Sequence, residues 1–129
     1  MKVMLLAAGR GERMRPLTDA TPKPLLEAGG QTLVARLIGR LAVAGFGDLV
    51  INHAHLGHKI EAALGDGARL GVRIRYSPEA TALETAGGIA NALGLLGLVF
   101  YDAVTAEIYT DFEFARLADV AREVARDPA

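Results

Sequence analysis

Cysteine is absent from the sequence, and neither sign of charge is in clear excess. The first absence excludes disulfide bonds, thiolate metal ligands and a cysteine nucleophile, and it fits a cytoplasmic protein. The charges, 14 basic against 15 acidic, give a formal net charge of −1. Such a balance provides no general attraction to nucleic acid or to an anionic membrane. The uncharged run over residues 85–101 is shorter than a membrane span and contains four glycines.

Strand-like and helix-like segments alternate along the chain of 129 residues, 51% of which are hydrophobic. These proportions are typical of one globular domain, residues 1–129. Apolar runs and helical spacing predict strands over 2–7, 49–51, 72–76 and 99–108, and helices over 33–41, 56–64, 86–96 and 114–124. The alternation predicts an α/β fold of three layers, with a Rossmann-like parallel sheet between helices.

Two of these segments carry additional signals. Arg73 and Arg75 alternate with apolar residues in the third strand, so we expect that strand at an edge of the sheet. Thr85 is the expected N-cap of the helix over 86–96, and Thr110 with Glu113 has capping-box spacing before the last helix.

The segment after the first strand, residues 8–24, is rich in glycine, arginine and proline, and we call it the glycine–arginine loop. It follows a strand end, where open α/β sheets bind ligands. Gly9 and Gly11 allow backbone amides to approach a polyphosphate. Arg13 can grip a phosphate bidentately, and Lys23, held between two prolines, can act as a point charge. The loop is therefore a candidate phosphate-binding site.

Common phosphate-binding motifs fit this loop poorly. A P-loop ends in Gly-Lys-Ser/Thr, which the loop lacks, and a dinucleotide-binding fingerprint would need glycine or alanine where Met14 stands. A basic surface loop with structurally tolerated glycines remains the alternative interpretation at this level.

The stretch from Leu6 to Leu25 resembles a more specific signature, L-A-A-G-x-G-x-R-x-x-P-L-T followed by T-P-K-P-L, of the sugar-1-phosphate nucleotidyltransferases. The resemblance is closest to the subgroup of N-acetylmuramate 1-phosphate uridylyltransferases, and residues 46–51, 53–57 and 83–88 match that subgroup as well. It implies the Rossmann-like fold of nucleotide-diphospho-sugar transferases. It also implies that a sugar 1-phosphate attacks the α-phosphorus of a nucleoside triphosphate, with UTP and N-acetylmuramate 1-phosphate as the expected substrates.

The same resemblance implies site residues. Arg13 and Lys23 would be the catalytic cations, on the outer phosphates and near the α-phosphate respectively. Further nucleotide-binding positions are expected in the loop, beside the base and on the fourth strand: Ala8, Gly9, Gly11, Glu12, Tyr76, Gly87, Gly88 and Thr105. Magnesium is the expected cofactor.

The fourth strand departs from the family pattern. Glu107 stands where the family has an aspartate that holds magnesium, and its longer side chain fits the short octahedral geometry of Mg²⁺ less well. Asp102 is an unexpected charge within a strand expected to be buried. A nucleotide-binding module without catalysis is therefore a second hypothesis.

Family members extend well beyond 129 residues, so a fragment of such an enzyme is a third hypothesis. If the chain ended here, the fourth strand would have an unpaired edge through which the protein could self-associate. No nucleic-acid or membrane partner is expected.

Other polar residues receive structural interpretations. His53, His55 and His58 lack a zinc-ligand pattern and are interpreted as ordinary surface or loop histidines. We interpret Glu79 as a polar loop residue and expect Glu84 to brace the turn into the next helix.

Overall fold

A parallel sheet of three strands forms the centre of the computed structural model, which describes residues 1–96, 100–102 and 107–109. The strands are β1 (Lys2–Leu6), β4 (Asp48–His53) and β5 (Arg73–Pro78), in the order β1-β4-β5. Both pairings are parallel. The expected parallel sheet is therefore confirmed, and so is the edge position of β5 within this sheet.

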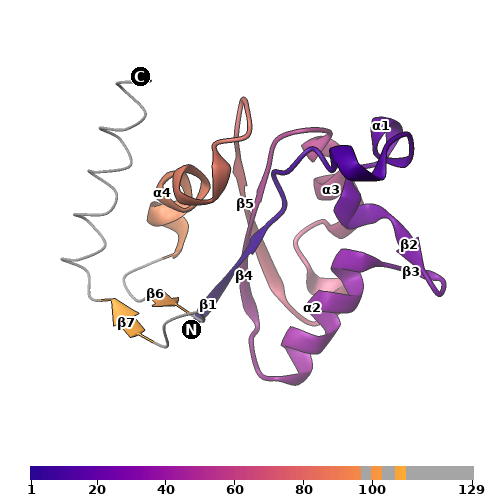
Figure 1. Ribbon diagram of the computed structural model, residues 1–129. Coiled ribbons are helices and arrows are strands. Elements are labelled where there is room, and N and C mark those ends of the chain that lie inside the picture. The colour runs from indigo at the N-terminus through magenta and orange to yellow at the C-terminus, as the bar shows by residue number, and fades with distance from the viewer. Residues whose placement is uncertain (97–99, 103–106, 110–129) are drawn as a thin grey trace, which may run out of the picture.

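Helices cover both faces of the sheet (Figure 1). Helices α2 (Leu33–Val43) and α3 (Gly57–Leu64) lie on one face, and α4 (Glu84–Leu96) lies on the other. Three layers result, as the sequence predicts. We refer to the two sides of the sheet as the α2/α3 face and the α4 face.

The hydrophobic core lies between the sheet and the α2/α3 face. Leu49 and Ile51 of β4 point into it and meet Ile38 of α2 and Ile60 of α3, each at most 1% exposed. Successive strand residues point to opposite faces, so Val50 and Asn52 point toward the α4 face. Because both faces are covered, β4 is buried from Leu49 to His53 and apolar over Leu49–Ile51, which is typical of a central parallel strand.

Helix α2 forms where the apolar spacing predicts it. The Thr32 side chain caps its start by accepting a hydrogen bond from the Ala35 amide at 3.2 Å. Val34 and Ile38 form the buried stripe, and Gly45 follows the helix with a φ of 90°.

Several short elements escape sequence prediction. They are β2 (Glu27–Ala28), β3 (Gln31–Thr32), α1 (Leu17–Ala20), and three turns of 3₁₀ helix at Glu12–Met14, Lys23–Leu25 and Ala68–Leu70. β2 and β3 pair as an antiparallel hairpin. Such short pieces have too few residues to show a period.

Two expectations in the C-terminal third are wrong. The single strand over 99–108 is two short strands, β6 (Phe100–Asp102) and β7 (Glu107–Tyr109), which pair antiparallel in a sheet of their own. A buried parallel strand needs a continuous apolar run, which Asp102 and Glu107 interrupt. Helix α4 begins at Glu84, so Thr85 lies within the helix rather than capping it. Thr105, the capping box at 110–113 and the helix over 114–124 fall outside the described residues.

In the part of the chain that the structure describes, no helix is both long and apolar enough to cross a membrane.

Candidate functional site

The glycine–arginine loop is folded back on itself by Thr18, which is 2% exposed. Its hydroxyl donates a hydrogen bond of 2.8 Å to the carbonyl of Gly11. Because that carbonyl is bound inside the loop, the peptide group that follows Gly11 has a fixed orientation. Seven residues separate the two groups in sequence, so this bond closes a compact turn.

Gly11 is tightly packed within the loop. Its φ of +71° is in the left-handed region that glycine favours. A Cβ atom at this position would lie 3.0 Å from Thr18 Cγ2 and 3.1 Å from Lys23 Cβ. The glycine therefore permits the two ends of the loop to meet, and it brings Lys23 next to the residues that precede Arg13.

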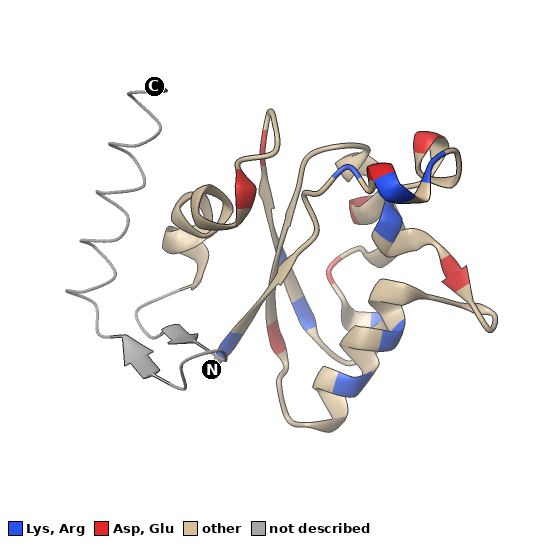
Figure 2. Cartoon of the chain, in the orientation of Figure 1, with Lys and Arg blue, Asp and Glu red and all other residues tan. Residues whose placement is uncertain are grey.

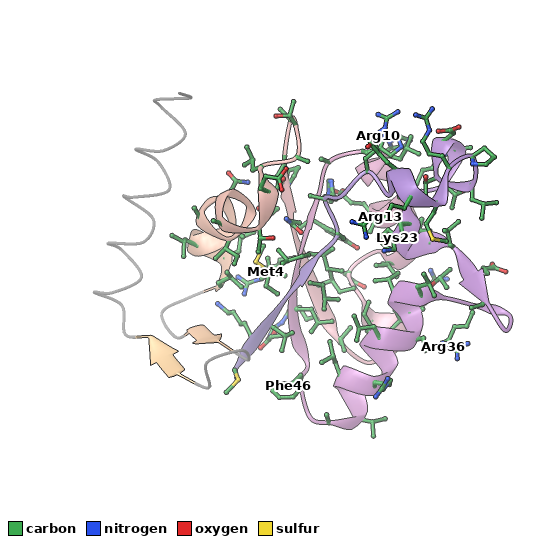
Figure 3. All side chains as sticks on the ribbon, in the orientation of Figure 1. Met4, Arg10, Arg13, Lys23, Arg36 and Phe46 are labelled. Atoms are coloured by element: carbon green, nitrogen blue, oxygen red, sulfur yellow. The ribbon has the colours of Figure 1, made fainter. Side chains whose placement is uncertain are left out.

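Arg13 and Lys23 are exposed, and Figure 3 shows both side chains on the glycine–arginine loop, which also carries Arg10. Figure 2 shows this loop as a region of interleaved basic and acidic residues. Among the described residues, the salt bridges involve neither Arg13 nor Lys23. These two positive charges are available to an anionic ligand.

Two residues near the start of α3, His55 and Lys59, hold the loop in place through hydrogen bonds. His55 Nε2 contacts the carbonyl oxygen of Thr18 at 3.1 Å. Lys59 donates a hydrogen bond of 2.5 Å to the carbonyl of Ala20. These contacts connect α1 to the end of β4, so the sheet sets the position of the loop. His55 thus has a structural role that its sequence position does not reveal.

A cavity of about 340 Å³ opens beside the loop, at the carboxyl ends of β1 and β4. Its lining combines the loop start, Asn52 and the beginning of α4: Leu6, Ala8, Gly9, Arg10, Asn52, Ala82, Glu84 and Thr85. The α4 N-terminus contributes its positive helix-dipole end. This is the location at which open parallel sheets bind ligands.

Of the predicted site residues whose side chains the structure describes, Ala8 and Gly9 line this cavity. Gly11, Glu12, Arg13 and Lys23 lie further along the same loop, outside the lining. The sequence analysis missed Asn52, although a polar residue that ends an apolar strand at its carboxyl end was a usable signal.

Gly87 and Gly88 contribute to packing around the cavity rather than to its lining. A Cβ on Gly87 would lie 2.8 Å from Leu83 Cβ. A Cβ on Gly88 would lie 2.6 Å from Asn52 Nδ2 and 2.8 Å from Glu79 Oε1. Gly88 therefore lets α4 approach the sheet closely, whereas Gly87 leaves room for Leu83 in the turn before α4.

Tyr76 lies on the α2/α3 face, away from the cavity, because it packs against the hydrophobic core. Its hydroxyl donates a hydrogen bond of 2.6 Å to the carbonyl of Gly65. Burial, followed by the negative charges of Glu61 and Asp66, raises the pKa of Tyr76 to about 12. The phenol therefore stays protonated and serves the fold.

Two interpretations of polar residues need correction. His53 is not a surface histidine: it is 6% exposed, and its Nε2 lies 2.5 Å from Glu61 Oε1. Glu79 does lie in the loop after β5, but it is buried: it is 7% exposed and accepts hydrogen bonds from Asn52 and from the Leu83 amide. Both are buried because a partner distant in sequence satisfies them. Glu79 braces the turn before α4, the role that the sequence assigned to Glu84.

The described side chains do not form a magnesium site on their own. No three His, Asp or Glu side chains come together in the portion of the chain whose side chains are described. The expected ligand Glu107 belongs to β7, of which only the backbone is described, and Thr105 falls outside the described residues.

Comparison with known proteins decides the family. A family model described as "Nucleotidyl transferase" matches residues 2–127. The chain belongs to the nucleotidyl transferase family. Among the relatives of this nucleotidyl transferase is the N-acetylmuramate alpha-1-phosphate uridylyltransferase of Neisseria meningitidis serogroup B, 60% identical over 88% of this chain and 50% of the relative.

Other relatives extend the same family. The mannose-1-phosphate guanylyltransferase of Mycobacterium tuberculosis is 36% identical over 95% of this chain and 36% of its own length. A solved structure from Bacillus anthracis, assigned as a glucose-1-phosphate thymidylyltransferase, superposes with a TM-score of 0.70 and 28% identity. The superposition covers 77% of this chain and 41% of the other. This nucleotidyl transferase therefore spans about half, or less, of the length of these relatives, and it shares their fold.

Proposed function

We propose that this chain holds the UTP of a sugar-1-phosphate uridylyltransferase, which joins UMP to N-acetylmuramate 1-phosphate and releases pyrophosphate. One observation carries the proposal: the family signature loop begins in the wall of a cavity at the carboxyl end of β1, through Ala8 and Gly9, and further along it packs Lys23 against Gly11. Relatives named as uridylyltransferases of this sugar phosphate, 60% and 44% identical, support the choice of substrates.

In this proposal the nucleoside occupies the cavity and the triphosphate extends along the glycine–arginine loop. The cavity of about 340 Å³ is within the usual range for a small-molecule site. Ala8 and Gly9 connect it to the loop, so the phosphates pass over backbone amides before they reach Arg13 and Lys23. Glu12 and Gly11 form the turn that orients these two cations.

The chemistry needs no covalent enzyme intermediate. An oxygen of the sugar 1-phosphate attacks the α-phosphorus in line, a new P–O bond forms, and the bond to the β-phosphate oxygen breaks as pyrophosphate leaves. Arg13 neutralises charge on the leaving phosphates, and Lys23 neutralises charge near the α-phosphorus. Positioning and charge neutralisation are the main sources of rate in such phosphoryl-type transfers.

Magnesium is part of the proposal as a cofactor, with Glu107 as its candidate protein ligand. When bound, Mg²⁺ would neutralise phosphate charge, because it prefers one or two carboxylates together with phosphate oxygens and water.

A calorimetric titration with UTP tests the binding half of the proposal. Arg13→Gln and Lys23→Met should each weaken binding by about tenfold or more, since each removes a charge-assisted contact with phosphate. Arg40→Gln is the matched control, because Arg40 is an exposed arginine on α2, remote from the loop. Equal binding by all four proteins would contradict the proposal.

A pyrophosphate-release assay with UTP and N-acetylmuramate 1-phosphate tests the transfer half. GTP with mannose 1-phosphate is the comparison pair, because a guanylyltransferase is among the relatives. UTP binding without pyrophosphate release from any pair would favour the second candidate, a nucleotide-binding module. The substitution of glutamate at position 107 motivates that candidate.

A further inference from the structure

Asn52 and Glu79 form a buried polar pair under the cavity. Asn52 is 2% exposed and Glu79 is 7% exposed. Asn52 Oδ1 accepts a hydrogen bond of 2.8 Å from the backbone amide of Ala7, and Nδ2 donates one of 2.8 Å to Glu79 Oε1. Glu79 Oε2 accepts a hydrogen bond of 2.9 Å from the amide of Leu83. A continuous chain of three hydrogen bonds therefore runs from Ala7 to Leu83.

This chain connects the two walls of the cavity. Ala7 immediately precedes Ala8 and Gly9, which form the wall on the side of the loop. Leu83 lies between Ala82 and Glu84, which form the wall on the side of α4. The two walls are far apart in sequence, so non-covalent contacts between α4 and the sheet, this chain of hydrogen bonds among them, hold their separation.

The backbone of α4 presses directly on the pair. A Cβ at Gly88 would come within 2.6 Å of Asn52 Nδ2 and 2.8 Å of Glu79 Oε1. Glycine therefore leaves the pair room to keep its geometry. In the described part of the chain, every buried side-chain N or O atom has a hydrogen-bond partner.

We propose that Asn52 and Glu79 are positioning residues that set the separation of the two cavity walls and thereby the affinity for UTP. The inference rests on the proposed function, since it names residues that act on the same nucleotide site. Glu79 does not line the cavity, so it acts through the backbone of the α4 wall; Asn52 lines the cavity and also acts through the backbone of Ala7.

The donor and acceptor pattern of the pair allows a reciprocal exchange. Because Asn52 Oδ1 accepts the hydrogen bond from the Ala7 amide, the NH₂ group of Asn52 must face Glu79. Glu79→Gln then places an NH₂ group against either the Asn52 NH₂ or the Leu83 amide, and one donor loses its acceptor. Asn52→Asp places a carboxylate oxygen against the Glu79 carboxylate, which is also unfavourable.

The double variant Asn52→Asp/Glu79→Gln restores all three hydrogen bonds, and only the bond between positions 52 and 79 has its polarity reversed. The new carboxylate at position 52 would accept hydrogen bonds from the Ala7 amide and from the new carboxamide NH₂ at position 79. The carboxamide oxygen at position 79 would accept from the Leu83 amide, while the net charge stays that of the wild type. We expect each single variant to bind UTP about tenfold more weakly and the double variant to bind within about threefold of the wild type.

Asn91→Ala is the matched control, because Asn91 also connects α4 to β5 through hydrogen bonds of 3.1 Å to Ser77 and 3.3 Å to the Pro78 carbonyl. Asn91 is exposed, and it is not among the cavity-lining residues. Its removal should leave UTP affinity unchanged. If Asn91→Ala weakened UTP binding as much as the single variants do, the proposal would be overturned. It would also be overturned if the double variant bound UTP no more tightly than the weaker-binding single variant.

Amide hydrogen exchange at Ala7 and Leu83 without nucleotide separates this inference from the proposed function. Faster exchange in the single variants, restored in the double variant, supports the connection between the walls even if wild-type protein fails to bind UTP. Unchanged exchange in the single variants refutes the connection. If Glu79→Gln does not fold, Gly88→Ala wedges the pair apart without changing a charge and should give the same faster exchange and weaker UTP binding. Normal exchange and UTP affinity in Gly88→Ala would contradict the proposal.

Discussion

Replacing Gly11 by alanine should disable the glycine–arginine loop, and Gly30 provides a control of the same backbone conformation. Gly11 has a φ of +71° and Gly30 a φ of +74°. Alanine in this left-handed region costs about 1–2 kcal/mol in either place. The surroundings differ, because nothing lies within 4 Å of a Cβ at Gly30, whereas Thr18 and Lys23 lie 3.0 and 3.1 Å from a Cβ at Gly11.

The additional crowding sets the expected difference between the two variants. Displacing tightly packed neighbours costs about 1–3 kcal/mol, so Gly11→Ala should lose about 2–5 kcal/mol of unfolding free energy in total. Gly30→Ala should lose only the backbone cost and keep wild-type UTP affinity. Gly11→Ala should also bind UTP at least about tenfold more weakly, because Lys23 must shift.

Urea denaturation and UTP calorimetry on both variants test this reasoning. Equal destabilisation by the two substitutions would show that Gly11 is not tightly packed against Thr18 and Lys23. Full UTP affinity in Gly11→Ala would show that the turn does not orient the phosphate-binding groups.

Glu84, Tyr76 and Gly57 each carry a further prediction. Glu84 has a φ of 59°, so Glu84→Gly should be more stable to urea than Glu84→Ala by about 1 kcal/mol, and equal stability would refute the strain. Tyr76 is protonated in the fold with a pKa raised to about 12, so wild-type stability should fall between about pH 10 and 12, and Tyr76→Phe should remove that part of the loss. An equal decline in both proteins would refute it. A Cβ on Gly57 would lie 1.9 Å from His53 Nδ1, so Gly57→Ala should lose about 2–4 kcal/mol by thermal unfolding; a loss near zero would contradict the packing.

The sequence predicts the sheet and its principal helices because these depend on local periodicity. The stripe of Val34 and Ile38 and the apolar run in β4 are each visible within a few residues. The prediction of a single strand over 99–108 is wrong because it followed the apolar average of the segment, although Asp102 and Glu107 interrupt a buried parallel strand.

The site is predicted less completely, because its parts meet only in three dimensions. The signature loop identifies Gly9 and Gly11, but nothing local indicates that Asn52 meets Glu79, 27 residues away. Tyr76 lies on a strand, and its position in the sequence does not show whether its side chain points toward the cavity or toward the core. Partners distant in sequence decide each of these cases.

An amide chemical-shift map recorded during UTP titration tests the central claim most directly. UTP should shift the amides of residues 8–11 and 84–85, at the loop and at the start of α4, with smaller changes at the α2/α3 face. Shifts confined to the α2/α3 face, or no shifts at millimolar UTP, would contradict a nucleotide site above β1.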